Sequence, residues 1–194
     1  MLYLDHHALS PLCDAARQAM DEAMDYAWAN PSSVHSMGQR AKGTLEQARK
    51  GIAHSIGAEP SEIVLTSGGT EACNLGIFGL TTSPGYLVST SIEHPAVNAP
   101  LSTLSAKAKH ERLLLPGGNL PCLETLATLL EQERVSLVAL QWVNHELGSI
   151  LPIEAVAALC HRAKVPLFVD ANQALGKLPI DVGAIPGVTA MAIA

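Results

Sequence analysis

The chain has 194 residues, of which 48% are hydrophobic and 15% are charged, so it can bury a sizeable core and is not a disordered protein. Its formal net charge is -6, and Lys and Arg are scattered rather than clustered, which argues against a nucleic-acid partner. No stretch approaches the roughly 20 apolar residues of a membrane span, and the start resembles no secretory signal, so we expect a cytoplasmic protein without a membrane partner.

The N-terminal residues predict two helices. The first covers 10–28, with Ser10 as the N-cap and Pro11 at the first helical position. The second covers 37–57 and has apolar residues at three- and four-residue spacing. We therefore expect residues 1–57 to form a helical arm.

From residue 58 onward, short apolar segments alternate with amphipathic ones. This alternation predicts an α/β domain over 58–194, with a mostly parallel sheet and helices on both of its faces. The predicted strands are 62–66, 86–91, 112–115, 135–141, 167–170 and 188–194, and the predicted helices are 71–80, 94–108, 122–133 and 152–164.

Ligands of such sheets bind at the carboxyl ends of the strands, so the loops there are the places to look for chemistry. The segment Ser67-Gly68-Gly69-Thr70 connects a predicted strand directly to a helix. Its glycines, the free N–H groups of the helix start and the Thr70 hydroxyl form a potential phosphate cradle. The segment is neither a Walker loop nor GxGxxG. An ordinary strand-to-helix turn is the alternative.

Polar residues follow three other predicted strands. Asp170 ends the strand 167–170, where a carboxylate is costly unless a cation or a hydrogen-bond donor accompanies it. It could hold a protonated ring nitrogen, bind a metal or cap the next turn, and Gln173 could donate a hydrogen bond nearby. His94 could stack on a flat ring or move a proton, or it could be purely structural. Asn144 and His145 follow a fourth strand.

Neither histidine nor cysteine spacing indicates a metal site. The histidines show no HxxxH or HExxH pattern, and the four cysteines are widely spaced without a CxxC pair. We expect most of the cysteines to be core thiols, because free cysteine is among the most buried residue types. The cysteines are Cys13, Cys73, Cys122 and Cys160.

Six segments taken in order carry a family resemblance: YLDHHALSP, NPSSVH, EIVLTSGGTEACN, SIEHPAV, VNHELG and VDANQALGKLPID. With them the chain resembles the N-terminal half of the NifS/IscS-type cysteine desulfurases, pyridoxal-phosphate (PLP) enzymes of the class V aminotransferase group. The resemblance implies the large domain of a fold-type I PLP-dependent transferase, truncated before the Schiff-base lysine and the small domain.

The resemblance also implies roles for individual residues. Gly69 and Thr70 would hold the cofactor phosphate, and His94 would stack on the pyridine ring and assist proton transfer. Asp170 would pair with the ring nitrogen, and Gln173 would hydrogen-bond the phenolic oxygen. The residues implied on the substrate side are Asn30, His35, Asn144 and His145, although the family usually has Asn at the position of His145.

The reaction implied is conversion of L-cysteine to L-alanine, with sulfur leaving as an enzyme persulfide for iron–sulfur clusters or thio-cofactors. The Schiff-base lysine, the carboxylate-binding arginine and the persulfide cysteine of the family do not match residues here. We therefore expect the N-terminal part of a split or truncated enzyme, in a homo- or hetero-oligomer such as a dimer. Its partners would be a C-terminal complementing polypeptide and a sulfur-acceptor protein. The alternatives are an inactive fragment serving as a binding or scaffold subunit, and a different phosphate-binding α/β enzyme.

Overall fold

The computed structural model describes residues 2–106, 109–117 and 120–194. The chain divides into two compact units, Met1–Val64 and Leu65–Ala194. Residues 58–64, expected to open the α/β domain, thus belong to the first unit.

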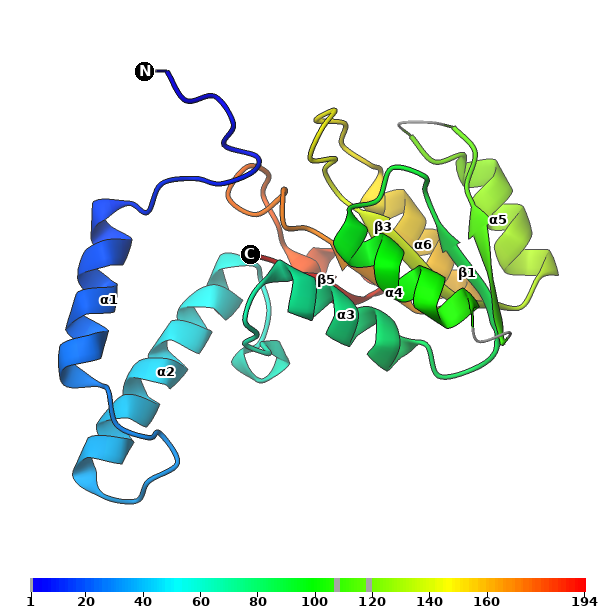
Figure 1. Ribbon diagram of the computed structural model, residues 1–194. Coiled ribbons are helices and arrows are strands. Elements are labelled where there is room, and N and C mark those ends of the chain that lie inside the picture. The colour runs from blue at the N-terminus through cyan, green and yellow to red at the C-terminus, as the bar shows by residue number, and fades with distance from the viewer. Residues whose placement is uncertain (1, 107–108, 118–119) are drawn as a thin grey trace. The chain divides into compact units, whose positions relative to one another are not determined.

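The N-terminal unit contains two helices and one short 3-10 turn, namely α1 (Asp14–Tyr26), α2 (Ser36–Ser55) and η1 (Pro60–Glu62) (Figure 1). The first helix begins later than predicted. Cys13 is its N-cap, and the Ser10 hydroxyl donates to the carbonyl of His6 (3.4 Å). Ser10 therefore serves a turn that precedes the helix. The second helix is close to its predicted bounds, and Gly57 follows it with a positive φ of 68°.

The predicted strand over 62–66 is wrong. Glu62 ends η1, where its carboxylate accepts from the Glu59 N–H (2.8 Å), and 63–66 lie in no strand. Val64 and Leu65 are exposed. A short apolar run becomes a strand only when another strand takes up its backbone groups. The strands in the described part of the chain pair only with one another here.

The second unit confirms the remaining alternation of strands and helices. Its elements are α3 (Gly69–Leu80), β1 (Gly85–Ser89), α4 (Pro95–Ser105), β2 (His110–Leu114), α5 (Leu123–Gln132), β3 (Val135–Gln141), α6 (Ile153–Ala163), β4 (Leu167–Asp170), η2 (Val182–Ala184) and β5 (Val188–Ala192). The last two residues of the predicted helix 94–108 lie outside the described residues.

The five strands form one sheet in the order β2-β1-β3-β4-β5, and every pair is parallel. Helices α3 and α4 pack together on one face, and α5 and α6 lie on the other (Figure 1). The chain leaves β1 toward β2 and then crosses over to β3, so the order reverses between β1 and β3. Such a switch point is where open α/β sheets bind ligands.

A buried cluster joins α3 and α4 to the sheet. It includes Cys73 and Ile77 from α3, Leu101 from α4, and Leu137 and Phe168 from β3 and β4. Alternate strand residues face the same side, so Gln141 and Asp170 lie on this face with Leu137 and Phe168. The sheet thereby directs the last side chains of β3 and β4 toward the α3 side.

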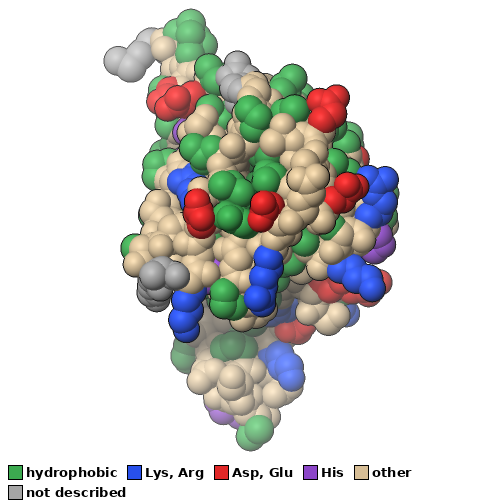
Figure 2. Space-filling view, turned by 90° about the vertical axis from the view of Figure 1, so that its right-hand side faces the viewer, with side chains coloured by type: hydrophobic (Ala, Val, Ile, Leu, Met, Phe, Trp, Pro, Cys, Tyr) green, Lys and Arg blue, Asp and Glu red, His purple; other side chains and the backbone are tan. Residues whose placement is uncertain are grey.

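The surface shows no segregation of charge on the face in view. In Figure 2, acidic and basic side chains are scattered among hydrophobic ones. None of the described helices is both long and apolar enough to cross a membrane.

Candidate functional site

Three strand ends meet at the carboxyl edge of the sheet. β1 leads to His94, β3 leads to His145, and β4 ends at Asp170. Because β3 lies between β1 and β4, these side chains become neighbours. The His94 and His145 rings are 4.9 Å apart between centroids, with an edge-on interplanar angle of 77°.

Asp170 is a buried carboxyl group, with 6% of its surface exposed. Burial raises its pKa, while the hydrogen bond from the Asn172 N–H (3.1 Å) and the charges of His94 and His145 lower it. The pKa-lowering effect of His94 and His145 reflects the closeness of Asp170 to both imidazoles. A cationic or N–H partner facing this carboxylate would offset the cost of its burial.

The start of α3 supplies the second part of the site. Gly68 precedes the helix at φ 152° and offers no side-chain cap. Glu71 accepts a hydrogen bond from the Ser67 N–H (2.6 Å), and bonding to Ser67 lowers the Glu71 pKa. The first helical bond runs from the Ala72 N–H to the Gly68 carbonyl (3.1 Å). The N–H groups of Gly69 and Thr70 therefore face out of the helix end, where an anion is favoured.

The helix start and the β4 loop are in direct contact. A Cβ on Gly69 would lie 2.5 Å from Nδ2 of Asn172, so only glycine fits without displacing that amide. Asn172 Oδ1 is buried, and no partner for it lies among the described residues. Sequence reasoning missed Asn172, although it stands between Asp170 and Gln173. Its amide joins the anion-binding helix start to the buried carboxyl group.

Cys73 lies next to this contact, and its buried thiol is poorly suited to act as a nucleophile. Its thiol is 4.0 Å from Nδ2 of Asn172. Burial, followed by the charges of Asp170 and Glu93, raises the Cys73 pKa to about 12. Burial also raises the pKa of Cys160 to about 12. Both are core thiols as predicted, whereas Cys13 is exposed and Cys122 is half-buried.

Asn144 is buried and shapes the loop after β3. Its Nδ2 donates to the Ile92 carbonyl (3.0 Å), and its Oδ1 accepts from the N–H groups of Glu146 (2.9 Å) and Leu147 (2.7 Å). These bonds set the turn that presents His145, whose Nε2 is 3.9 Å from Glu146 Oε1. The geometry supports a positioning role for Asn144, and its contact with substrate stays a prediction.

The other expected site residues differ in their surroundings. Thr70 is exposed, and Gln173 is half-buried and accepts a hydrogen bond from Lys177 Nζ. Asn30 and His35 lie in the N-terminal unit. Asn30 Oδ1 accepts from the Ser32 N–H (2.9 Å), and His35 caps α2 by accepting from the Gly38 N–H (3.2 Å). Their substrate-side role stays a prediction.

A second residue missed by sequence reasoning is Glu93, immediately before His94. It is 4% exposed, and its pKa is raised to about 7, mainly by burial. Glu93 lies in the loop after β1 rather than at the end of a strand, so the pattern that identified Asp170 does not include it, and its place directly before His94 is the one sequence signal.

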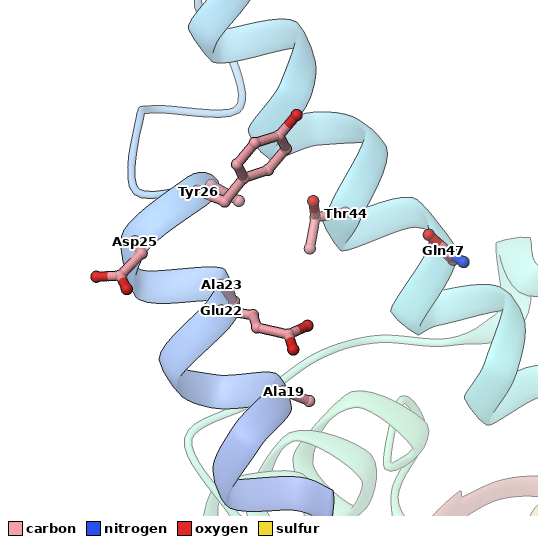
Figure 3. A pocket seen from close by; sticks show the side chains of 8 residues that line it. Ala19, Glu22, Ala23, Asp25, Tyr26, Thr44 and Gln47 are labelled. Carbon is pink, nitrogen blue, oxygen red and sulfur yellow. The ribbon is translucent and has the colours of Figure 1, made fainter.

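A separate groove of about 690 Å³ lies in the N-terminal unit, between α1 and α2 (Figure 3). Glu22 and Tyr26 reach toward α2, whereas Asp25 points away from it. None of the residues lining it is among those predicted to do chemistry. No group of three or more His, Cys, Asp or Glu in the described part of the chain could hold a metal ion.

The fold and this sheet edge define a large domain of the fold-type I PLP-dependent transferases. The chain belongs to the aminotransferase class-V family, which it matches over residues 2–188. Pyridoxal phosphate is the cofactor of that family.

Individual known proteins that resemble this chain are consistent with this family. The chain is 37% identical to an IscS-like cysteine desulfurase of Mycobacterium tuberculosis, in an alignment covering 100% of this chain and 51% of that protein. The apo structure of a cysteine desulfurase from Thermococcus onnurineus NA1 matches it with a TM-score of 0.91 at 28% identity, covering 100% of this chain and 49% of that one. SspA in complex with cysteine matches with a TM-score of 0.89 at 29% identity, over 99% and 56%. The chain spans about half the length of the curated relatives that it matches.

Proposed function

We propose that this chain forms the cofactor-binding part of a PLP-dependent cysteine desulfurase, which converts L-cysteine to L-alanine and passes the sulfur to an acceptor protein. The convergence of Asp170, His94 and the Gly69-Thr70 helix start at one sheet edge carries the proposal. The relatives named as cysteine desulfurases support this reaction over other reactions of class-V aminotransferases.

The residues present fit pyridoxal phosphate. The N–H groups of Gly69 and Thr70, with the Thr70 hydroxyl, would hold the phosphate. Asp170 would face the ring nitrogen, whose proton supplies the cationic partner that a buried carboxylate requires. Gln173 would donate to the phenolic oxygen, and the flat ring of His94 would lie against the pyridine. When bound, the cofactor acts as an electron sink for the bonds at the substrate α-carbon.

His94 is suited to hold a proton at one defined atom. Its Nδ1 accepts a hydrogen bond from the Ala96 N–H (3.1 Å). The neutral ring therefore carries its proton on Nε2, which is left to face the ligand. His145 contacts the His94 ring edge-on and adds a second imidazole beside Asp170. We propose that His145 lies on the substrate side of the site.

The proposal assigns the Schiff-base lysine to polypeptide outside residues 1–194. Lys42 and Lys50 lie in the N-terminal unit, and Lys107 lies outside the described residues. Lys109 and Lys164 precede β2 and β4 and so lie at the amino edge of the sheet, opposite the site. Lys177 donates to Gln173 Oε1.

We assign the persulfide cysteine to the complementing polypeptide as well, because none of the four cysteines of this chain matches that of the family. Cys73 and Cys160 are buried thiols whose pKa values are raised to about 12, which disfavours the nucleophilic thiolate. A complementing polypeptide would supply the lysine, the persulfide cysteine and the carboxylate-binding arginine, and the active enzyme would be an oligomer.

Cofactor binding by the chain tests the proposal directly. Pyridoxine 5′-phosphate is the suitable probe, because it has no aldehyde and cannot react with surface lysines. Equilibrium dialysis should show saturable binding. Asp170→Asn should weaken binding about 10–100-fold, since a hydrogen bond to a charged group contributes about 1.5–3 kcal/mol. Asp181→Asn is the matched control, because Asp181 caps η2 and Asn preserves that cap.

Two results would contradict the proposal: no saturable binding by the folded chain, or equal affinities of the wild type and Asp170→Asn. The reaction itself is tested by adding the complementing polypeptide and measuring alanine formed from L-cysteine, with L-serine as the control substrate. Cofactor binding without alanine formation would favour a scaffold role.

A further inference from the structure

Glu93 connects the loop after β1 to the end of β3. Its Oε1 accepts a hydrogen bond from the Thr90 hydroxyl (2.5 Å), and its Oε2 accepts from the Gln141 N–H (2.8 Å). β1 and β3 are the strands between which the sheet order reverses. The side chain therefore bridges the two strands at the switch point, one residue before His94.

The same loop is held by two amide side chains from the β3 side. The Ile92 carbonyl accepts from Gln141 Nε2 (2.7 Å) and from Asn144 Nδ2 (3.0 Å). The Glu93 carbonyl accepts from Asn98 Nδ2 (2.5 Å) on α4. The backbone on either side of the Glu93 Cα is thus fixed by hydrogen bonds.

Arg112 of β2 holds the beginning of the loop. Its Nε donates to Ser89 Oγ (3.0 Å), and its Nη2 donates to the Thr90 carbonyl (3.3 Å) and to Asn98 Oδ1 (2.5 Å). Arg112 and Glu93 share Thr90 as a hydrogen-bond partner, and burial lowers the pKa of Arg112 while the charge of Glu93 raises it. Side chains from β2, β3 and α4 therefore converge on residues 89–93.

This hydrogen-bond network fixes the orientation of the His94 ring. His94 caps α4 through Nδ1, and its ring edge meets His145. Both contacts depend on the position of the backbone that precedes His94. A buried carboxyl group costs stability relative to an apolar side chain of similar volume. In return for this cost, the Glu93 carboxyl group holds in place the loop that presents His94.

We propose that Glu93 is a positioning residue: by bridging Thr90 and the Gln141 N–H, it holds His94 in the orientation and Nε2–H tautomer that the cofactor site uses. The inference rests on the proposed function for the importance of His94, and it adds a residue that acts through His94 rather than on the cofactor.

The test compares Glu93→Ala with Glu93→Gln in the full chain. Glutamine can accept from the Gln141 N–H through Oε1 and donate to Thr90 Oγ1 through Nε2, so it preserves the bridge without the charge. Alanine leaves the buried Gln141 N–H and Thr90 hydroxyl without their partner. Glu111→Gln, at an exposed position on β2, is the control.

Two measured quantities should change together: the His94 NMR signals and the affinity for pyridoxine 5′-phosphate. In NMR spectra of ¹⁵N-histidine-labelled protein, the His94 signals, assigned with His94→Gln, should show the Nε2–H tautomer in the wild type, Glu93→Gln and Glu111→Gln. Glu93→Ala should lose this pattern and bind pyridoxine 5′-phosphate about tenfold more weakly. Glu93→Gln should stay within about threefold of the wild type.

A folded Glu93→Ala protein with the wild-type His94 pattern would overturn the proposal, as would failure of Glu93→Gln to restore that pattern. If Glu93→Ala does not fold, Thr90→Val provides the test instead, because it removes only the bond from the Thr90 hydroxyl and keeps the bond from the Gln141 N–H. It should shift the His94 signals, and an unchanged spectrum would overturn the proposal. Absence of ligand binding in the wild type would contradict the proposed function but leave the tautomer comparison valid.

Discussion

At the scale of single residues, two buried carboxyl groups serve different purposes at the same sheet edge. Asp170 lies beside two imidazoles whose charges favour its ionised form. Glu93 lies deeper, among Thr90 and the Gln141 N–H, and the charge of Asp170 adds to the burial that raises its pKa to about 7. Asp170 is thus the better partner for a cationic ligand atom, whereas Glu93 changes its ionisation near neutral pH.

This difference predicts a pH-dependent stability. Because the Glu93 pKa rises from 4.5 to about 7 on folding, the folded state binds more protons than the unfolded state between these values. The contribution of Glu93 to stability is fully present below about pH 4.5 and is lost as the pH rises through about 7. Glu93→Gln removes this loss. The free energy of unfolding of Glu93→Gln minus that of the wild type should therefore be about 1–3 kcal/mol larger, in the direction of higher stability, at pH 8 than at pH 5.

Urea unfolding of both proteins at a series of pH values measures this difference, and influences shared by the two proteins, including Asp170, largely cancel. Glu111→Gln, on the exposed side of β2, should show a difference from the wild type that hardly changes with pH. A pH-independent difference for Glu93→Gln would show that Glu93 keeps one ionisation state throughout the range.

Sequence reasoning at this scale found the residues at the ends of apolar strands but not those that hold them. Asp170 and His94 were identified because a polar group directly after an apolar strand is conspicuous. Asn172 and Glu93 stand beside them, but their roles depend on Gly69 and Gln141, which are distant in the chain.

At the scale of elements, α3 links the anion-binding end of the site to the core. Its first turn presents Gly69 and Thr70, and its middle packs on the sheet through Gly76. A Cβ on Gly76 would lie 2.4 Å from the ring of Phe168, two residues before Asp170 on β4. The position of the helix start therefore depends on a close contact half a helix away.

Two glycine substitutions in α3 test this contact. Gly76→Ala should destabilise the protein by about 1–3 kcal/mol, because the ring of Phe168 or the helix has to shift. It should also weaken binding of pyridoxine 5′-phosphate, since the helix start moves with the helix. Gly79→Ala is the matched control, because its Cβ would meet nothing within 4 Å.

Gly79→Ala should be neutral or should stabilise the protein by up to about 1 kcal/mol, through the higher helix propensity of alanine. Thermal unfolding and equilibrium dialysis measure both effects. Equal stability of the two variants would show that α3 is not held at the distance seen against Phe168.

Helix ends were harder to predict than helices. His35 and His94, chosen for their chemistry, both act as N-caps and accept from the N–H groups of Gly38 and Ala96. The apolar spacing that defines a helix says little about which polar side chain satisfies its first N–H groups. A histidine was an unexpected cap for that reason.

At the scale of the whole molecule, the two units differ in how much core they have. The α/β unit has a core around its sheet: every residue of β4 and all but the first residue of β3 are buried, and most of them are apolar. In the N-terminal unit α1 has no buried residue, and Met20, Met24 and Tyr26 are exposed. Local opening should therefore be far easier in α1 than in the sheet.

Amide hydrogen exchange followed by mass spectrometry checks this expectation. Peptides from α1 should exchange fastest among the helices, and peptides from β3 and β4 should exchange slowest. Protection of α1 equal to that of β3 would mean that α1 is covered in solution, and repeating the measurement over a range of protein concentrations would show whether a second copy covers it.

The sequence by itself determined the succession of helices and strands, the parallel sheet and the positions of Asp170 and His94 at strand ends. These features follow from local periodicity and from the rule that parallel strands share a carboxyl edge. Only the tertiary structure decided that 62–66 forms no strand, that Gly69 meets Asn172, and that Glu93 joins β1 to β3. Each depends on which distant segments become neighbours, and the order β2-β1-β3-β4-β5, not the spacing along the chain, sets those neighbours.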